Sequence, residues 1–240
     1  MAPIVNIAGY QFVTLNELEA WRTKAKNFCE GQPLKGTLVF SPEGINIMLA
    51  GADSAIRAFE AWIRSFPEFS RLEFKYSYSE FVPFKRMYVK IKPMLVPGST
   101  HPLKETAPTL NPHELKAWYE SGKDFVIIDT RNDYELEFGK FSQAIKLDLQ
   151  EFKHFEEALR ALDPALKAKP AVFYCTGGIR CEKAAPMAQK AGFREVYQLE
   201  GGILNYFKEC GGAHYEGACY VFDERRALTP EFKASLQQKA

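Results

Sequence analysis

The strongest constraint on the fold is a short apolar run that ends at a cysteine and is followed at once by glycines and a helical pattern. The run from Ala171 to Tyr174 is typical of a buried strand. A helical pattern begins near Glu182, and the turn before it consists of Cys175, Thr176, Gly177, Gly178, Ile179, Arg180 and Cys181. Strand and helix patterns alternate through the second half of the chain, which indicates a parallel α/β sheet.

The position of Cys175 suggests a reactive thiol. Backbone N–H groups of the turn and of the first helical turn converge at such a place. Their field, together with the charge of Arg180, favours the thiolate, which is the reactive form of cysteine. Gly177 and Gly178 permit left-handed backbone conformations that turn the amides inward. The sequence therefore predicts hydrogen-bond donors around one sulfur, an arrangement suited to a persulfide or a bound anion.

Length and charge limit the other possibilities. The 240 residues suffice for one large domain or two small ones, each with its own core. The formal net charge is +1, so a nucleic-acid site must be a local patch. No apolar stretch approaches the ~20 residues of a membrane span, and the N-terminus has no secretion-signal pattern. We therefore expect a cytoplasmic protein without a membrane segment.

The cysteines favour free thiols over structural disulfides. Their number is odd, and the five positions are Cys29, Cys175, Cys181, Cys210 and Cys219. Cys210, His214 and Cys219 do not have the spacing of a common zinc site, and no fourth ligand is evident. Neither a facial-triad ligand set nor a flavin motif is visible. We expect no metal ion and no resident cofactor.

Residues 1–95 predict a ferredoxin-like α+β domain. The expected strands cover residues 5–13, 38–40 and 45–49, and residues 72–76 and 87–91 supply one or two further strands. The expected helices cover 17–28 and 53–66. Asn16 is the expected N-cap of the first helix. The order of these elements favours four antiparallel strands with two helices on one face.

A group of basic residues near the end of this domain is a candidate RNA-binding surface. It consists of Lys85, Arg86, Tyr88, Lys90 and Lys92. Lys90 and Lys92 alternate with apolar residues, so on a strand both amines point to the same face. Cations beside an aromatic ring suit phosphate neutralisation and base stacking. The alternative is a solvated strand face without a ligand.

A proline-rich linker at residues 96–112 leads to the second domain, at 113–212, and a C-terminal extension at 213–240.

The apolar strand at residues 125–128 ends at Asp129. We expect Asp129 to orient backbone amides of neighbouring loops and Arg131 to pair with Glu135. Both roles are structural.

Several motifs carry a family resemblance. Cys175-x-x-Gly178-x-Arg180 resembles the active loop of rhodanese sulfurtransferases, and the string from Cys175 to Lys183 resembles the rhodanese-domain tRNA uridine-34 hydroxylases, the TrhO family. Further matches to these families are Glu43-Gly44-Ile45-Asn46, Asp129-x-Arg131 with Glu135, Gly201-Gly202, and Tyr220-Val221-Phe222-Asp223-x-Arg225, where Tyr220 replaces the usual Phe.

The resemblance implies an acylphosphatase-like domain followed by a rhodanese-like catalytic domain that is docked to it. It implies oxygen-dependent 5-hydroxylation of uridine 34 in tRNA, with molecular oxygen as co-substrate and Cys175 as the reacting group. No sulfur or electron donor is indicated. A sulfurtransferase that carries a Cys175 persulfide and a binding module without catalysis are the alternatives. Cys181 either resolves a persulfide or sulfenate on Cys175 or is a half-buried structural residue.

Overall fold

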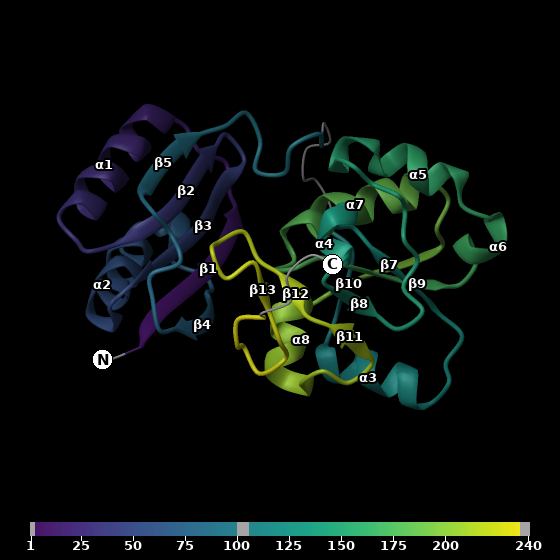
Figure 1. Cartoon of the computed structure of the whole chain (residues 1–240). Coiled ribbons are helices and arrows are strands. Elements are labelled where there is room, and N and C mark those ends of the chain that lie inside the picture. Colours follow the sequence, from purple (N-terminus) through teal and green to yellow (C-terminus); the bar gives the residue numbers. More distant parts are fainter. Residues whose placement is uncertain (1–2, 100–105, 236–240) are drawn as a thin grey trace. The chain divides into compact units, whose positions relative to one another are not determined.

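The computed structural model describes residues 3–99 and 106–235, and the chain divides into two compact units, Met1–Leu95 and Val96–Ala240 (Figure 1). Part of the predicted linker, including Pro102, lies outside the described residues. In the described part of the chain, no helix is long and apolar enough to cross a bilayer.

The first unit is built on a mixed sheet of five strands. They are β1 (Ile4–Phe12), β2 (Lys35–Ser41), β3 (Gly44–Gly51), β4 (Lys75–Ser79) and β5 (Met87–Ile91), in the order β4-β1-β3-β2-β5. β5 runs parallel to β2, and the other neighbouring pairs are antiparallel. The four predicted antiparallel strands are present as β4-β1-β3-β2, and the prediction did not include β5 as a fifth, parallel strand. Between β4 and β5 the chain passes from one edge of the sheet to the other. β5 therefore pairs with β2, and these two strands run in the same direction.

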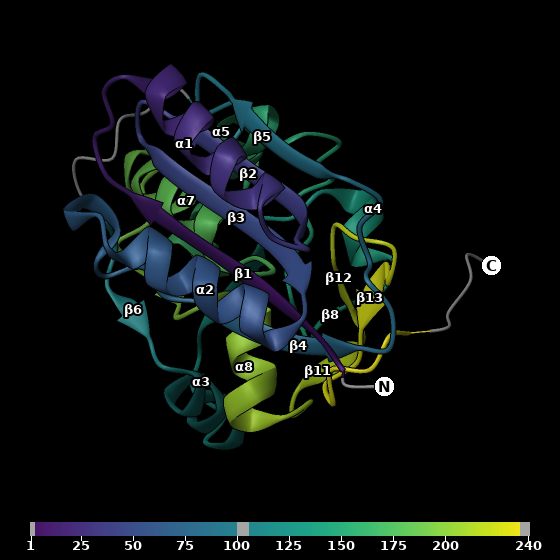
Figure 2. The same ribbon diagram turned by 90° about the vertical axis from the view of Figure 1, so that its left-hand side faces the viewer.

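Helices α1 (Leu18–Glu30) and α2 (Asp53–Arg64) cover one face of this sheet (Figure 2). A 3₁₀ turn follows at Pro67–Phe69. Alternate strand residues such as Leu38 and Ile47 are fully buried in the core beneath the helices. The expected Asn16 cap is wrong: Glu17 occupies the N-cap position in a left-handed conformation and makes no side-chain cap.

The second unit contains a four-stranded parallel sheet. The strands are β6 (Thr109–Leu110), β7 (Val126–Asp129), β9 (Pro170–Tyr174) and β10 (Glu195–Leu199), in the order β6-β10-β9-β7. Helices α3 (Pro112–Glu120) and α8 (Gly202–Cys210) lie on one side, and α5 (Phe155–Ala161) and α7 (Ile179–Lys190) lie on the other (Figure 1). This confirms the parallel α/β prediction.

Strand β9 is apolar throughout because both of its faces are covered. Val172 and Tyr174 belong to the core that includes α3 and α8. Phe173 points to the other side, where its ring centroid lies 6.2 Å from that of Phe155 and 5.6 Å from that of Phe193. Ligand sites of such sheets lie at the carboxyl ends of the strands. Cys175 follows directly on β9 at this edge.

Shorter elements complete the second unit. They are α4 (Asp133–Leu136), β8 (Gly139–Phe141), a 3₁₀ turn at Phe152–His154, α6 (Pro164–Lys167), β11 (Tyr215–Gly217), β12 (Cys219–Tyr220) and β13 (Ala227–Leu228). β11 pairs with β8, and β12 pairs with β13. The segment after α8 thus packs as part of the second unit.

Candidate active site

Cys175 lies between the end of β9 and the beginning of α7. The helix begins at Ile179, earlier than the sequence pattern suggested, so Arg180 belongs to its first turn. Gly178 is the N-cap with a φ of 102°, which favours glycine, and its backbone N–H donates to Cys175 Sγ at 3.1 Å. Gly177 is not among the residues with positive φ, and a Cβ there would meet nothing within 4 Å. Of the two glycines, Gly178 therefore shapes the turn.

The surroundings of Cys175 stabilise its thiolate. The residue is 1% exposed, and this burial by itself opposes ionisation. The opposing influences are a hydrogen bond from the Cys181 thiol, the charge of Arg180 and backbone N–H groups of the turn. Together they outweigh burial and lower the pKa of Cys175 to about 5. At neutral pH the sulfur is therefore an anion in a closed, donor-lined site.

Cys181 is the neutral partner of this pair. It lies on α7 and is fully buried, whereas the structural alternative for this residue predicted half burial, and its Sγ is 4.0 Å from Thr130 Oγ1. Burial, followed by the neighbouring Cys175 sulfur, raises the pKa of Cys181, so it keeps its proton. A protonated thiol in this position is a hydrogen-bond donor to the Cys175 anion.

Arg180 is held by Glu135 in a two-pronged ion pair. Arg180 Nη1 donates to Glu135 Oε1 at 2.5 Å, and Nη2 donates to Oε2 at 2.8 Å. Glu135 is fully buried and also accepts the backbone N–H of Asn132 at 3.0 Å. The expected pairing of Arg131 with Glu135 is therefore wrong. Glu135 instead fixes the guanidinium whose charge acts on Cys175.

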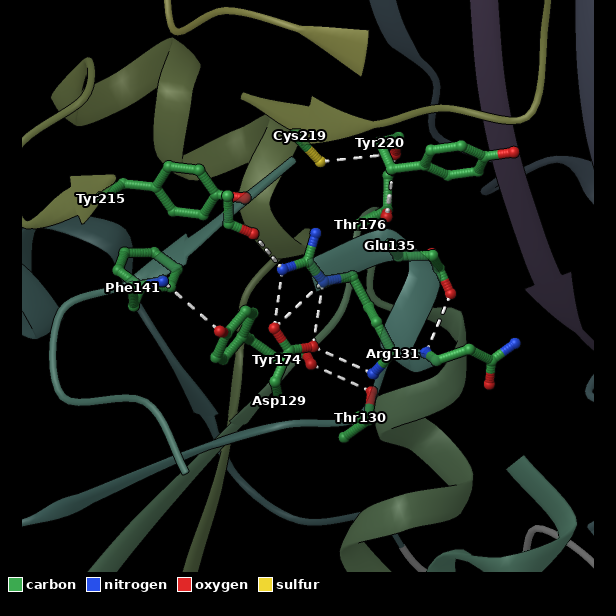
Figure 3. Close-up of polar contacts among 12 residues, drawn as sticks. Asp129, Thr130, Arg131, Glu135, Phe141, Tyr174, Thr176, Tyr215, Cys219 and Tyr220 are labelled. Carbon is green, nitrogen blue, oxygen red and sulfur yellow. Dashed lines mark hydrogen bonds and ion pairs between the residues drawn. The ribbon is translucent and has the colours of Figure 1, made fainter. Parts of the chain in front are cut away.

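Arg131 binds Asp129 (Figure 3). Its Nε donates to Asp129 Oδ1 at 2.9 Å, and its Nη2 donates to Asp129 Oδ2 at 2.7 Å and to the Gly139 carbonyl at 2.7 Å. Asp129 Oδ1 also accepts the backbone N–H of Arg131 at 2.9 Å. Asp129 and Arg131 are both buried. They connect the end of β7 to β8, which is a structural role next to the site.

The beginning of α8 supports the active turn from its backbone side. The N–H of Ile203 donates to the carbonyl of Cys175 at 3.0 Å, and the N–H of Leu204 donates to that of Thr176 at 3.1 Å. Gly202 allows this approach, since a Cβ there would lie 2.5 Å from the Cys175 carbonyl oxygen. The Gly201-Gly202 motif therefore packs directly against the Cys175 turn.

The basic residues belong to the other unit. Tyr88, Lys90 and Lys92 are exposed, and Lys90 Nζ lies 4.8 Å from the centre of the Tyr88 ring. Val89 packs against the core beneath α1 and α2, so Tyr88 and Lys90 point from the opposite face of the sheet. Lys85 and Arg86, just before β5, are exposed as well. The structure thus brings the Cys175 group together on one unit and the basic group on the other.

Two contacts of the site escaped the sequence analysis. The first is the ion pair between Glu135 and Arg180: the sequence analysis singled out Glu135, but nothing local in the sequence links it to Arg180. The Thr176 hydroxyl donates to the Tyr220 carbonyl at 3.3 Å, which ties the active turn to β12. Within residues 3–99 and 106–235, no group of three or more His, Cys, Asp or Glu side chains is arranged to hold a metal ion.

Comparison with known proteins covers both units. Residues 4–95 match the family described as UPF0176 acylphosphatase like domain, and residues 111–209 match the Rhodanese-like domain. Among solved structures, the rhodanese-like domain of an Anabaena protein aligns with 47% of this chain and 80% of its own at 25% identity and a TM-score of 0.38.

Curated relatives match nearly the whole chain. A protein of Cupriavidus necator named tRNA uridine(34) hydroxylase is 45% identical over 96% of this chain and 84% of its own length. One of Bordetella avium with the same name is 44% identical over 96% of this chain and 98% of its own. These matches confirm the resemblance found in the sequence. The chain belongs to the family of tRNA uridine(34) hydroxylases.

Proposed function

We propose that this protein hydroxylates C5 of uridine 34 in tRNA, with molecular oxygen as co-substrate and Cys175 as the reacting group. The names of its relatives support the reaction. The observation that supports the role of Cys175 is the hydrogen bond from the Gly178 N–H to its sulfur in a site that lowers the pKa of the thiol. The ionised sulfur is the nucleophile that an unactivated uracil ring requires.

The chemistry begins with addition of the thiolate to C6 of uracil. A bond forms between Sγ and C6, the C5–C6 double bond opens, and C5 becomes electron-rich. C5 then takes up one oxygen atom of O₂, and loss of the C5 proton and of the sulfur restores the double bond. The second oxygen atom leaves as water, with two electrons and two protons supplied by an external thiol reductant.

The burial of Cys175 places a condition on this step. Because the residue is 1% exposed, uracil reaches the sulfur only after the turn opens or after the sulfur is extended by one atom. A persulfide is such an extension and forms when a donor transfers one sulfane sulfur atom to the thiolate. A sulfenic acid is another and forms when a peroxide oxidises the thiolate by two electrons. The N–H groups that stabilise the thiolate suit either extended form as well.

In this proposal the first unit contacts tRNA and the second modifies it. Lys85, Arg86, Lys90 and Lys92 neutralise phosphates, and the Tyr88 ring stacks on a base. The partner is thus tRNA, and the compartment is the cytoplasm.

A sulfurtransferase is the second candidate. The donors around the Cys175 sulfur favour it, since they would also hold a persulfide. In that case the purified protein releases thiocyanate from thiosulfate and cyanide, and Cys175→Ser abolishes the release.

The decisive experiment is mass spectrometry of tRNA nucleosides from a strain that lacks the gene. We expect the oxygen on C5 of uridine 34 to disappear, to return with the wild-type gene, and not to return with Cys175→Ser. Equal hydroxylation in all strains would overturn the proposed reaction. Full rescue by Cys175→Ser would overturn the role of the thiol.

A further inference from the structure

Three aromatic rings form a partly exposed cluster beside the Cys175 turn. Tyr134 lies on α4, Tyr220 lies on β12, and Phe222 follows β12; we call these three residues the aromatic cluster. The ring centroids of Tyr134 and Tyr220 are 5.4 Å apart at an interplanar angle of 84°, and those of Tyr220 and Phe222 are 5.2 Å apart at 89°. Both contacts are edge-to-face, so the rings are not stacked face to face on one another.

The exposure of these rings distinguishes them from the rest of the unit. Tyr134 is 39% exposed and Phe222 is 47% exposed. Within residues 106–235 they are the large apolar side chains that remain exposed. The other aromatic contacts of this unit include core rings such as Phe141 and Tyr174. Exposed apolar side chains that gather in one place, with a polar rim, mark binding surfaces.

The aromatic cluster is joined to the active turn at two points. Tyr220 accepts the hydroxyl of Thr176, the residue after Cys175, at its carbonyl. Tyr134 directly precedes Glu135, whose carboxylate holds Arg180. A molecule bound on these rings is therefore next to the turn that carries the reactive sulfur.

The charges around the cluster are mixed, with exposed cations and exposed anions close together. Arg226 is exposed, and its guanidinium lies 5.9 Å from the ring of Phe138, which in turn contacts Tyr220 at 5.3 Å. The Asp223 carboxylate is bound by Arg225, with Nη2 to Oδ2 at 2.6 Å, and both side chains are largely buried. Glu224 is exposed in the same turn. We therefore expect the rings to supply most of the affinity and Arg226 to contact phosphate.

From this arrangement we propose that unpaired bases of an RNA loop stack on Tyr134, Tyr220 and Phe222 while the neighbouring uridine enters the Cys175 turn. The inference rests on the proposed function and adds the surface that holds the substrate loop. Enzymes that modify a base must take it out of the stack, and its neighbours then lose their stacking partners. Aromatic side chains replace those partners for any base, since every base has a π-face.

Binding of two RNA probes tests this proposal. The first is a hairpin with an anticodon-loop sequence, and the second is a fully paired duplex of the same length. For Tyr134→Ala and for Phe222→Ala we expect hairpin affinity to fall about tenfold each, in the range found for single base–aromatic stacks. Duplex affinity should not change, because a duplex offers no unpaired base. Thermal melting of each variant checks that it is folded.

Matched variants separate stacking from general disturbance. Tyr134→Phe and Phe222→Tyr keep the rings and should bind the hairpin like the wild type. Tyr78→Ala removes a ring that is 58% exposed on the first unit and should leave hairpin affinity unchanged. Unchanged hairpin affinity in both cluster alanine variants, or an equal loss for hairpin and duplex, would overturn the proposal.

The outcome is separable from that of the proposed function. If the cluster variants lose hairpin affinity but the deletion strain keeps its hydroxylated uridine, the reaction is wrong and the stacking surface stands. If uridine 34 loses its oxygen in the deletion strain and the cluster variants bind and restore it fully, the reaction stands and the stacking surface is wrong.

Discussion

The charge at the Cys175 turn is buried, whereas the charges on strand β5 are exposed to solvent. At Cys175 one anion is enclosed by fixed partners, which include the Gly178 N–H and the paired Arg180. On β5 the Lys90 ammonium is exposed beside Tyr88 and keeps its hydration. A buried charge depends on each neighbour for its state, whereas an exposed charge depends mainly on solvent and salt. The two regions should therefore respond differently to substitution, pH and ionic strength.

The largest expected effect is on the buried ion pair. Glu135→Gln removes the anion from Arg180 and leaves a buried cation partly unpaired, so we expect a loss of about 3–5 kcal/mol in the free energy of unfolding. Urea denaturation measures it. The control is Glu19→Gln, which breaks the exposed pair with Arg22 and should cost less than about 1 kcal/mol. Similar losses in the two variants would remove the distinction between enclosed and exposed charge.

The backbone support of the turn should give the next largest effect. Gly202→Ala places a Cβ 2.5 Å from the Cys175 carbonyl oxygen and adds strain at a φ of 68°, so we expect a loss of roughly 2–4 kcal/mol. Gly177→Ala meets no atom within 4 Å and should change stability by less than about 1 kcal/mol. Thermal melting of both proteins measures the difference. If Gly202→Ala is tolerated as well as Gly177→Ala, α8 does not define the turn.

The ionisation of Cys175 predicts a pH dependence. Because folding lowers the pKa of the thiol from 9.0 to about 5, the unfolded state binds the extra proton between these values. Stability should therefore rise with pH in this window, by up to about 1.4 kcal/mol per pH unit, and the gain is lost as pH falls toward 5. Denaturation at several pH values compares wild type with Cys175→Ser, which should lack this contribution. Parallel curves for the two proteins would mean that Cys175 is protonated.

The exposed lysines should have the smallest effect on the fold. Lys90→Glu combined with Lys92→Glu should alter the free energy of unfolding by less than about 0.5 kcal/mol each, because both side chains are in solvent. The same double variant should weaken tRNA binding and reduce its salt dependence. Titrations at several salt concentrations measure this, with Lys26→Glu on α1 as the control. If the double variant binds tRNA as tightly as the Lys26→Glu control does, this strand face is exposed to solvent and does not bind RNA.

The fold could be read from the sequence where pattern and environment agree. The run from Ala171 to Tyr174 is apolar because β9 is buried on both faces, and alternation identified β5 at Met87–Ile91. The start of α7 was misplaced because its N-cap is Gly178, which carries no capping side chain. The mixed sheet was missed because no local signal tells which edge a strand will join.

Prediction of the candidate site was limited in the same way, because contacts between residues distant in sequence could not be predicted. Residues in one turn, such as Cys175 and Arg180, were recognised together because they are close in sequence. The predicted partner of Glu135 was Arg131, but the Arg131 guanidinium binds Asp129. Long-range pairs depend on how strands and helices pack, and a single sequence does not state this.

The double attachment of Thr176 has a consequence for how the second unit works. Its carbonyl is held by α8 and its hydroxyl by β12. The turn that carries the Cys175 sulfur is thus held in place by β12, a segment that contains no reacting group. Loss of the contact with β12 would let the turn move. The thiolate would then lose its stabilising partners although no residue in contact with the sulfur had changed.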